Sequence, residues 1–306
     1  MVEKKECSGN CESCPMREQC LGIVSDASKE NPIFAKIFNR MKNVRHKILI
    51  LSCKGGVGKS TLTSQLAFAL AAHTKNNQPL NIGVLDIDLC GPCIPKMMGV
   101  ENEEVRQSSE GWSPVFVNEN LCVMSMGFLL ENKEDALIWR GPKKNGMIQS
   151  FLSEVDWDNL DVLLIDTPPG TSDEKISIVQ MLNASCKPDG AVLITTPQDV
   201  ALMQIKKELQ FCNKTKTKVL GVVENMSFFC CPHCSKETAL FNIGEGVQKI
   251  CDEHKVAFLG KIPLDSIVVN ACEKGIPLNK ESTTNPATKA IEGVAEQLLK
   301  IIDGNN

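Results

Sequence analysis

The 306-residue sequence contains no tyrosine, and aromatic residues make up only 5% of it. It has no apolar run near the ~20 residues that a membrane-spanning helix needs, which argues against a membrane protein. Acidic and basic residues nearly balance at a net charge of −4, so charge does not predict nucleic-acid binding. The N-terminus lacks the apolar core of a signal peptide and carries acids unlike a transit peptide. We therefore expect a cytoplasmic protein, with nuclear presence compatible with the same features.

Cysteines, by contrast, are abundant, with 15 in the chain. In a long chain without an export signal, clustered cysteines more often bind metal or iron–sulfur clusters than form disulfides. The first cluster is Cys7, Cys11, Cys14 and Cys20, in a segment with few apolar residues that needs a metal centre to fold. The spacing favours an iron–sulfur cluster, with a four-cysteine zinc site as the alternative and disorder without metal as a third.

A glycine-rich turn follows the apolar run at 47–52 and opens a helical pattern. The turn and the first helical residues are Gly55, Gly56, Val57, Gly58, Lys59, Ser60 and Thr61. The glycines let successive N–H groups form a concave nest for phosphate oxygens, and the helix N-terminus adds partial positive charge. Lys59 is placed to reach the terminal phosphates, and the Ser60 hydroxyl to bind Mg²⁺. The segment predicts a phosphate-binding loop, although Cys53 occupies the position where the usual pattern has glycine.

The rest of the chain alternates apolar runs with helical patterns. Strands are expected at 47–52, 81–86, 161–166, 190–196, 218–224 and 256–261, and helices at 59–73, 143–154, 174–182, 199–211, 242–252 and 286–302. Continuous apolar runs indicate strands covered on both faces. We expect an α/β fold with a doubly wound, mostly parallel sheet and helices on both faces, as in P-loop NTPases. A hairpin is added at 113–126, and the domain boundary is expected between a cysteine-rich segment with a helical linker (1–45) and an ATPase domain (46–306).

Acidic residues follow two of the expected strands. Asp86 and Asp88 close the second strand, and Asp166 closes the third. Because the carboxyl ends of parallel strands bind ligands in such sheets, these acids should face the phosphate-binding loop. Asp166 lies where the second acid of P-loop NTPases holds Mg²⁺ through water. Gly170, in the loop that follows, would offer a free backbone N–H to a γ-phosphate.

A second thiol site is the pair Cys231 and Cys234, in a loop near 230–235, with Cys230 as an alternative ligand. One C-x-x-C supplies two thiolates, whereas four-coordinate iron or zinc needs four. The other two ligands come from elsewhere in the chain or from another subunit, or they are missing altogether. A two-fold axis through the pair would supply them. A zinc half-site and a redox pair are the alternatives to a shared cluster.

Several of these segments resemble one protein family. Residues 54–61 resemble the deviant P-loop of the MinD/nitrogenase iron-protein class, and 86–92, 139–144, 168–174 and 224–227 resemble its Mrp branch. Together with both thiol sites, they resemble cytosolic iron–sulfur cluster assembly scaffold ATPases that carry an N-terminal cluster. The chain departs from that family pattern at Cys93, where serine is usual, and at Lys175, where histidine is usual.

The resemblance implies a role for each matching residue. Lys54 would reach the partner's nucleotide across a face-to-face dimer, as an arginine finger does. Asp88 would orient the attacking water, Asp86 would support the metal, and Asn225 would recognise adenine. The paired Cys231 and Cys234 of two subunits would hold a labile bridging [4Fe–4S] cluster, and the four N-terminal cysteines a more tightly bound [4Fe–4S] cluster.

The function implied is an ATP-binding and ATP-hydrolysing scaffold, with slow intrinsic hydrolysis, that assembles [4Fe–4S] clusters and passes them to cytosolic and nuclear apo-proteins. It would act as a homodimer or as a hetero-oligomer with a related scaffold ATPase subunit, and would bind recipient and targeting proteins. The alternative is a MinD-like positioning ATPase with structural zinc, although the last helix balances acids and bases and so lacks a basic membrane-binding face. A reductase resembling the nitrogenase iron protein is a third interpretation.

Overall fold

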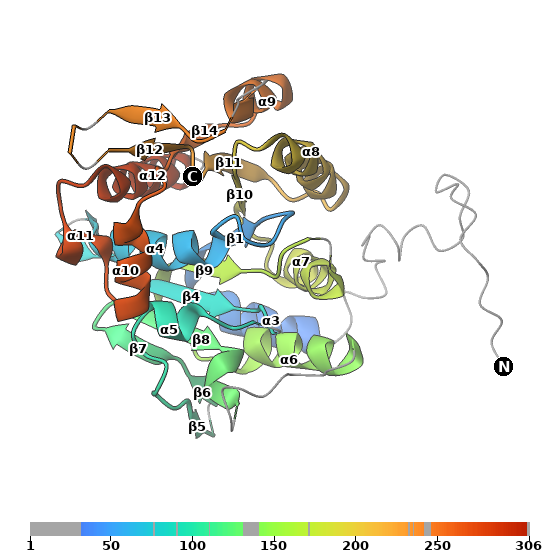
Figure 1. Ribbon diagram of the computed structural model, residues 1–306. Coiled ribbons are helices and arrows are strands. Elements are labelled where there is room, and N and C mark those ends of the chain that lie inside the picture. Colours follow the sequence, from blue (N-terminus) through green and yellow to red (C-terminus); the bar gives the residue numbers. More distant parts are fainter. Residues whose placement is uncertain are drawn as a thin grey trace, which may run out of the picture.

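The computed structural model describes residues 32–75, 77–89, 91–109, 111–130, 141–170, 172–231, 233–234, 236–241 and 246–304. Within these residues one eight-stranded sheet has the order β14-β11-β10-β1-β9-β4-β8-β7 (Figure 1). Its strands are β1 (Val44–Leu51), β4 (Ile82–Asp86), β7 (Val115–Asn118), β8 (Leu121–Ser125), β9 (Leu160–Asp166), β10 (Gly190–Thr195), β11 (Val219–Glu224) and β14 (Phe258–Lys261). All neighbours pair in parallel except β7 with β8.

Two hydrophobic cores cover the two faces of this sheet. Side chains of β1 alternate between them, because Leu49 and Leu51 enter one core and Ile48 and Ile50 enter the other. The first core is covered by α3 (Pro32–Met41), α6 (Gly141–Glu154), α7 (Asp173–Ser185), α8 (Asp199–Lys214) and α9 (Gly246–His254). The second is covered by α4 (Lys59–Ala71), α5 (Ile94–Met97), α10 (Ser266–Lys274), α11 (Leu278–Glu281) and α12 (Pro286–Asp303). The predicted doubly wound α/β fold is confirmed.

The hairpin expected at 113–126 is present as β7 and β8 and belongs to the main sheet, because β8 pairs in parallel with β4. Smaller elements complete the described chain: β2 (Thr74–Lys75), β3 (Gln78–Pro79), β5 (Arg106–Ser108), β6 (Gly111–Ser113), a 3₁₀ turn (Met126–Leu129), β12 (Phe228–Cys230) and β13 (Glu237–Ala239). No described helix is long and apolar enough to cross a membrane.

Helix α3 corresponds to the helical linker expected before the first strand. Its Ile37 and Met41 are fully buried in the first core, beside residues of α6 and α7. The helix therefore packs as part of the ATPase domain, although it lies before the boundary expected at residue 46. Cys7, Cys11, Cys14 and Cys20 lie outside the described residues, so their role as ligands stays a prediction.

Candidate nucleotide site and cysteine hairpin

The predicted phosphate-binding loop connects β1 to α4. Gly56 and Gly58 have φ angles of 79° and 81°, in the left-handed region that favours glycine. A Cβ added at Gly55 or Gly56 would meet no atom within 4 Å, so the loop backbone is open there. At Gly58 a Cβ would lie 2.3 Å from Asn225 Nδ2, so even a methyl group is excluded. This glycine-lined, open backbone fits the nest that phosphate binding requires.

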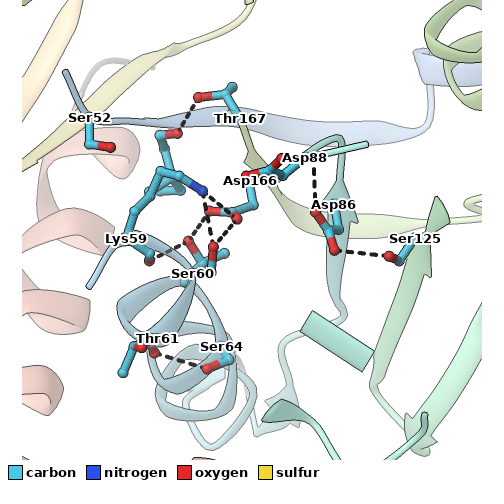
Figure 2. Close-up of polar contacts among 12 residues, drawn as sticks. Ser52, Lys59, Ser60, Thr61, Ser64, Asp86, Asp88, Ser125, Asp166 and Thr167 are labelled. Carbon is cyan, nitrogen blue, oxygen red and sulfur yellow. Dashed lines mark hydrogen bonds and ion pairs between the residues drawn. The ribbon is translucent and has the colours of Figure 1, made fainter. Parts of the chain in front are cut away.

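Lys59, Ser60 and Asp166 meet beneath this loop, as the sequence predicted (Figure 2). Lys59 Nζ lies 2.5 Å from Asp166 Oδ2, to which the Ser60 hydroxyl also donates at 2.6 Å. The Thr63 hydroxyl donates to Asp166 Oδ1 at 2.7 Å, and Asp166 is fully buried. The carboxylate therefore has a counter-charge and two hydroxyl donors, which a buried charge needs. A hydroxyl beside a buried carboxylate is also a donor set suited to Mg²⁺.

Asp86 lies beside Asp166 because the two residues are in register on β4 and β9. The Ser125 hydroxyl donates to Asp86 Oδ2 at 2.9 Å, and the Asp88 N–H donates to Oδ1 at 3.1 Å (Figure 2). Burial, together with the Asp166 carboxylate, raises the pKa of Asp86 to about 7. A cation beside the two acids would favour the ionised form of both, so the pair is chemically suited to a divalent metal.

Lys54 and Gly170 are near the loop but are bound to their own chain. Lys54 Nζ donates to Gln198 Oε1 at 3.1 Å, immediately before α8. The Gly170 N–H donates to the Ser52 carbonyl oxygen at 3.0 Å. The expectation that this N–H is free is therefore corrected: it must leave Ser52 before it can contact a phosphate. Reach of Lys54 into a partner's site stays a prediction.

Asn225 and Thr61 also lie at the loop. The Asn225 side-chain amide donates to the Val57 carbonyl oxygen at 2.8 Å, so it braces the loop backbone. Thr61 lies in the first turn of α4, where its carbonyl accepts from the Ser64 hydroxyl at 2.9 Å (Figure 2). Adenine recognition by Asn225 is not tested by these contacts and stays a prediction.

Four residues at the site were missed or noted only as departures from the usual patterns: Glu208, Cys53, Lys175 and Cys93. The Cys53 thiol donates to Glu208 Oε2 at 2.7 Å, and Glu208 pairs with the fully buried Lys175. Burial and the Glu208 carboxylate raise the pKa of Cys53 to about 12, so this thiol stays protonated. One signal could have found Glu208: it falls among Ile205, Leu209 and other apolar residues on the buried face of α8.

Cys93, the last of these residues, lies beside Asp86 and Ser60. Burial and the Asp86 carboxylate raise the pKa of Cys93 to about 11, and the Ser60 hydroxyl contacts its thiol. A neutral thiol here can take the place of the usual serine hydroxyl as a small polar neighbour of Ser60.

The second predicted site lies on the hairpin of β12 and β13, near the β14 end of the sheet and far from β7 (Figure 1). Cys231 is half-buried and Cys234 is exposed. The N–H groups of His233 and Cys234, followed by the Cys234 thiol, lower the pKa of Cys231. Cys230 and Cys231 line a cavity of about 670 Å³ together with Phe229, Leu264 and Val269.

This thiol pair finds no further ligands in the part of the chain that the structure describes. There, no group of three or more His, Cys, Asp or Glu side chains is placed to hold a metal ion. Two thiols fit an iron–sulfur cluster only if two more ligands come from another chain or from residues outside those described.

Comparison with known proteins places the chain among iron-transfer NTPases. The model of the ParA family, described as "NUBPL iron-transfer P-loop NTPase", matches residues 43–299. The chain is 48% identical over 294 residues to the cytosolic Fe-S cluster assembly factor Nubp1 homolog of Drosophila melanogaster, covering 94% of this chain and 92% of that protein.

Two solved structures are similar in fold. A nucleotide-binding protein of Archaeoglobus fulgidus, solved with ADP, is 37% identical with a TM-score of 0.68 over 81% of this chain and 93% of that one. The cell division ATPase MinD of Pyrococcus furiosus is 22% identical with a TM-score of 0.57 over 84% of this chain and 99% of that one. The MinD likeness shows the fold alone. The family model and the Nubp1 relative favour a role in iron–sulfur cluster assembly over the positioning-ATPase alternative.

Proposed function

This chain belongs to the ParA/NUBPL family of iron-transfer P-loop NTPases, and we propose that it is an ATP-hydrolysing scaffold that assembles [4Fe–4S] clusters and transfers them to cytosolic and nuclear apo-proteins. One observation carries the proposal: the chain combines a phosphate-binding loop, whose lysine and buried acid are already in contact, with a thiol pair that lacks half its ligands among the residues described. The Nubp1 relative, named a cytosolic factor, supports the same activity and compartment.

In this proposal the nucleotide site works through the residues already in contact. The N–H groups of residues 55–58 hold the phosphates, and Lys59 exchanges its contact with Asp166 for a phosphate oxygen. Ser60 and Asp166 would hold one Mg²⁺ ion, which neutralises phosphate charge when bound. Asp86 would support the metal beside Asp166, and Asp88 would orient the attacking water.

The thiol site depends on a second subunit. Cys231 and Cys234 of each chain would together supply four thiolates, so a [4Fe–4S] cluster can form only in a homodimer or a hetero-oligomer with a related scaffold ATPase. Because Cys234 is exposed, a cluster held there remains accessible to a recipient protein. Cys7, Cys11, Cys14 and Cys20 would hold a second [4Fe–4S] cluster that stays with the chain.

Nucleotide and cluster would be coupled through the dimer. When Lys54 leaves Gln198 and reaches the partner's nucleotide, it completes that active site, as an arginine finger does. Hydrolysis by a single chain is therefore slow. ATP shifts the dimer geometry only through contacts that it makes better in one arrangement than in the other.

The test is iron and sulfide content after anaerobic reconstitution of the full chain. Cys231→Ala and Cys234→Ala should each remove the bridging cluster and retain the N-terminal one, so iron and sulfide fall together. Cys230→Ala tests the alternative ligand in the same cavity: its iron and sulfide should stay at the wild-type values, and a loss would assign Cys230 to the cluster. Undiminished iron and sulfide in both variants would contradict the shared cluster. Zinc without sulfide in the wild-type protein would support the positioning ATPase instead.

A further inference from the structure

A closed ring of polar contacts lies directly behind the phosphate-binding loop. Lys175 Nζ donates to the Gly170 carbonyl oxygen at 2.9 Å and lies 3.5 Å from the Ser52 carbonyl oxygen. The same ammonium pairs with Glu208 Oε1, and Glu208 Oε2 accepts from the Cys53 thiol at 2.7 Å. Because Cys53 follows Ser52 in the chain, the ring closes on itself. It joins the end of β1, the loop after β9, α7 and α8.

The ion pair in this ring is fully buried, with 0% of either side chain exposed. Two charges in the interior persist only when each is paired and hydrogen-bonded, and loss of one partner is strongly destabilising. The Lys175 ammonium also lies 5.3 Å from the centre of the Phe211 ring. Neither charge belongs to the phosphate and metal contacts described above, so the pair needs a different explanation.

The ring fixes both backbone polar groups of Gly170. Its N–H is held by the Ser52 carbonyl and its own carbonyl by Lys175, and the same ammonium reaches the Ser52 carbonyl. Lys175 thus contacts both residues of the hydrogen bond that occupies the Gly170 N–H. ADP lacks the γ-phosphate that this N–H would contact, whereas ATP must compete with Ser52 for it.

We propose that Lys175, with Glu208 as its buried counter-ion, is a positioning residue that holds the Gly170 N–H on the Ser52 carbonyl and thereby lowers the affinity for ATP relative to ADP. This deepens the proposed function, on which it rests, by assigning control of the γ-phosphate contact. Cys53 supports the device because its protonated thiol satisfies the second oxygen of Glu208. A glycine at residue 53 would have no side chain to do so.

The test compares the affinities of ATPγS and ADP for the full chain with Mg²⁺, by isothermal titration calorimetry. The variant Lys175→Met/Glu208→Gln removes both charges together and leaves neither buried alone, while the new side-chain amide oxygen can still accept from Cys53. The dissociation constant for ATPγS should fall about tenfold, which corresponds to about 1.4 kcal/mol. The constant for ADP should stay within about twofold of the wild-type value. Cys53→Ala is a milder change. It should lower the dissociation constant for ATPγS, relative to that for ADP, by about threefold.

Leu209→Ala is the matched control for lost stability, because Leu209 is the buried neighbour of Glu208 on α8 but takes no part in the ring. This variant should weaken the binding of both nucleotides equally or leave both affinities unchanged. An unchanged ratio of ATPγS to ADP affinity in the double variant, or in Cys53→Ala if the double variant does not fold, overturns the inference and leaves the proposed function standing. Failure of the wild-type chain to bind either nucleotide overturns both.

Discussion

The nucleotide edge of the sheet and the cysteine hairpin differ in how many of their contacts the chain itself supplies. At the nucleotide edge, Asp166 is fully buried and receives an ammonium and two hydroxyls from α4. At the hairpin, Cys231 and Cys234 are half-buried and exposed, and the described residues offer no further ligand. The first site is organised by folding, whereas the cluster site proposed for the hairpin would need ligands from an assembly.

This difference separates the effects of substitution at the two regions. Buried polar groups at the nucleotide edge contribute to stability as well as to chemistry, because loss of one partner leaves another unsatisfied. Exposed thiols contribute little to the free energy of folding. Changes at the first region should therefore alter both stability and activity, and changes at the second should alter cluster content and dimerisation with little effect on stability.

The largest effect is expected for Lys59→Ala. ATP turnover should fall by more than about 100-fold because the phosphates lose their lysine. The free energy of unfolding should fall by about 3 kcal/mol because Asp166 stays buried without its counter-charge. Turnover assays and urea unfolding measure the two quantities. Lys59→Met/Asp166→Asn is the control and should regain most of the stability but none of the turnover; equal stability of Lys59→Ala and wild type would contradict the comparison.

Removal of the bridging cluster should change dimerisation but not the stability of the chain. Treatment of reconstituted protein with an iron chelator should weaken dimerisation by about tenfold, because the shared ligands bind only the assembled state. The urea midpoint of the chain should not change. Sedimentation at several protein concentrations measures the association, and Cys234→Ser should match the chelated wild type without any chelator. A dimer that is indifferent to both treatments would show that the hairpin is not at the subunit interface.

Asp86→Asn should change how stability depends on pH. The folded-state pKa of Asp86 is about 7, above its ordinary value of 3.8. Its stabilising contribution is therefore complete below about pH 3.8 and is lost as pH rises through about 7. The gain in Tm of the variant over wild type, measured without metal and nucleotide, should be about 5–10 °C larger at pH 8 than at pH 5, which corresponds to about 3 kcal/mol. A gain independent of pH would place the perturbed group elsewhere.

The smallest effect is expected for Asn225→Ala. Its amide donates to the Val57 carbonyl, so its loss should loosen the loop and weaken ATP binding by about three- to tenfold. Because the contact is to the loop backbone, the affinity for inorganic triphosphate should fall by the same factor. Competition titrations with both ligands decide the matter. Weakening of ATP alone would assign Asn225 to adenine recognition, the role that the family resemblance implies.

Much of the nucleotide site could be predicted because its signals are local. The strand, the glycine-rich turn and Lys59 lie within one short stretch, and Asp86 and Asp166 each end an apolar run. Parallel pairing then brings those strand ends together, as the register of β4 and β9 shows. The occupied N–H of Gly170 could not be predicted, because its acceptor is the Ser52 carbonyl at the end of another strand.

The sequence by itself determined the α/β class and the position of the phosphate-binding loop, because each depends on the period or spacing of nearby residues, and it predicts the two thiol sites on the same basis. Tertiary structure decided the ring formed by Lys175, Glu208 and Cys53, whose thiol and carboxylate are 155 residues apart in the chain. It also decided that α3 joins the core of the ATPase domain. The physical reason is the same in both cases. Burial and pairing depend on which elements pack together, and a local sequence pattern does not show which distant residue a side chain will contact.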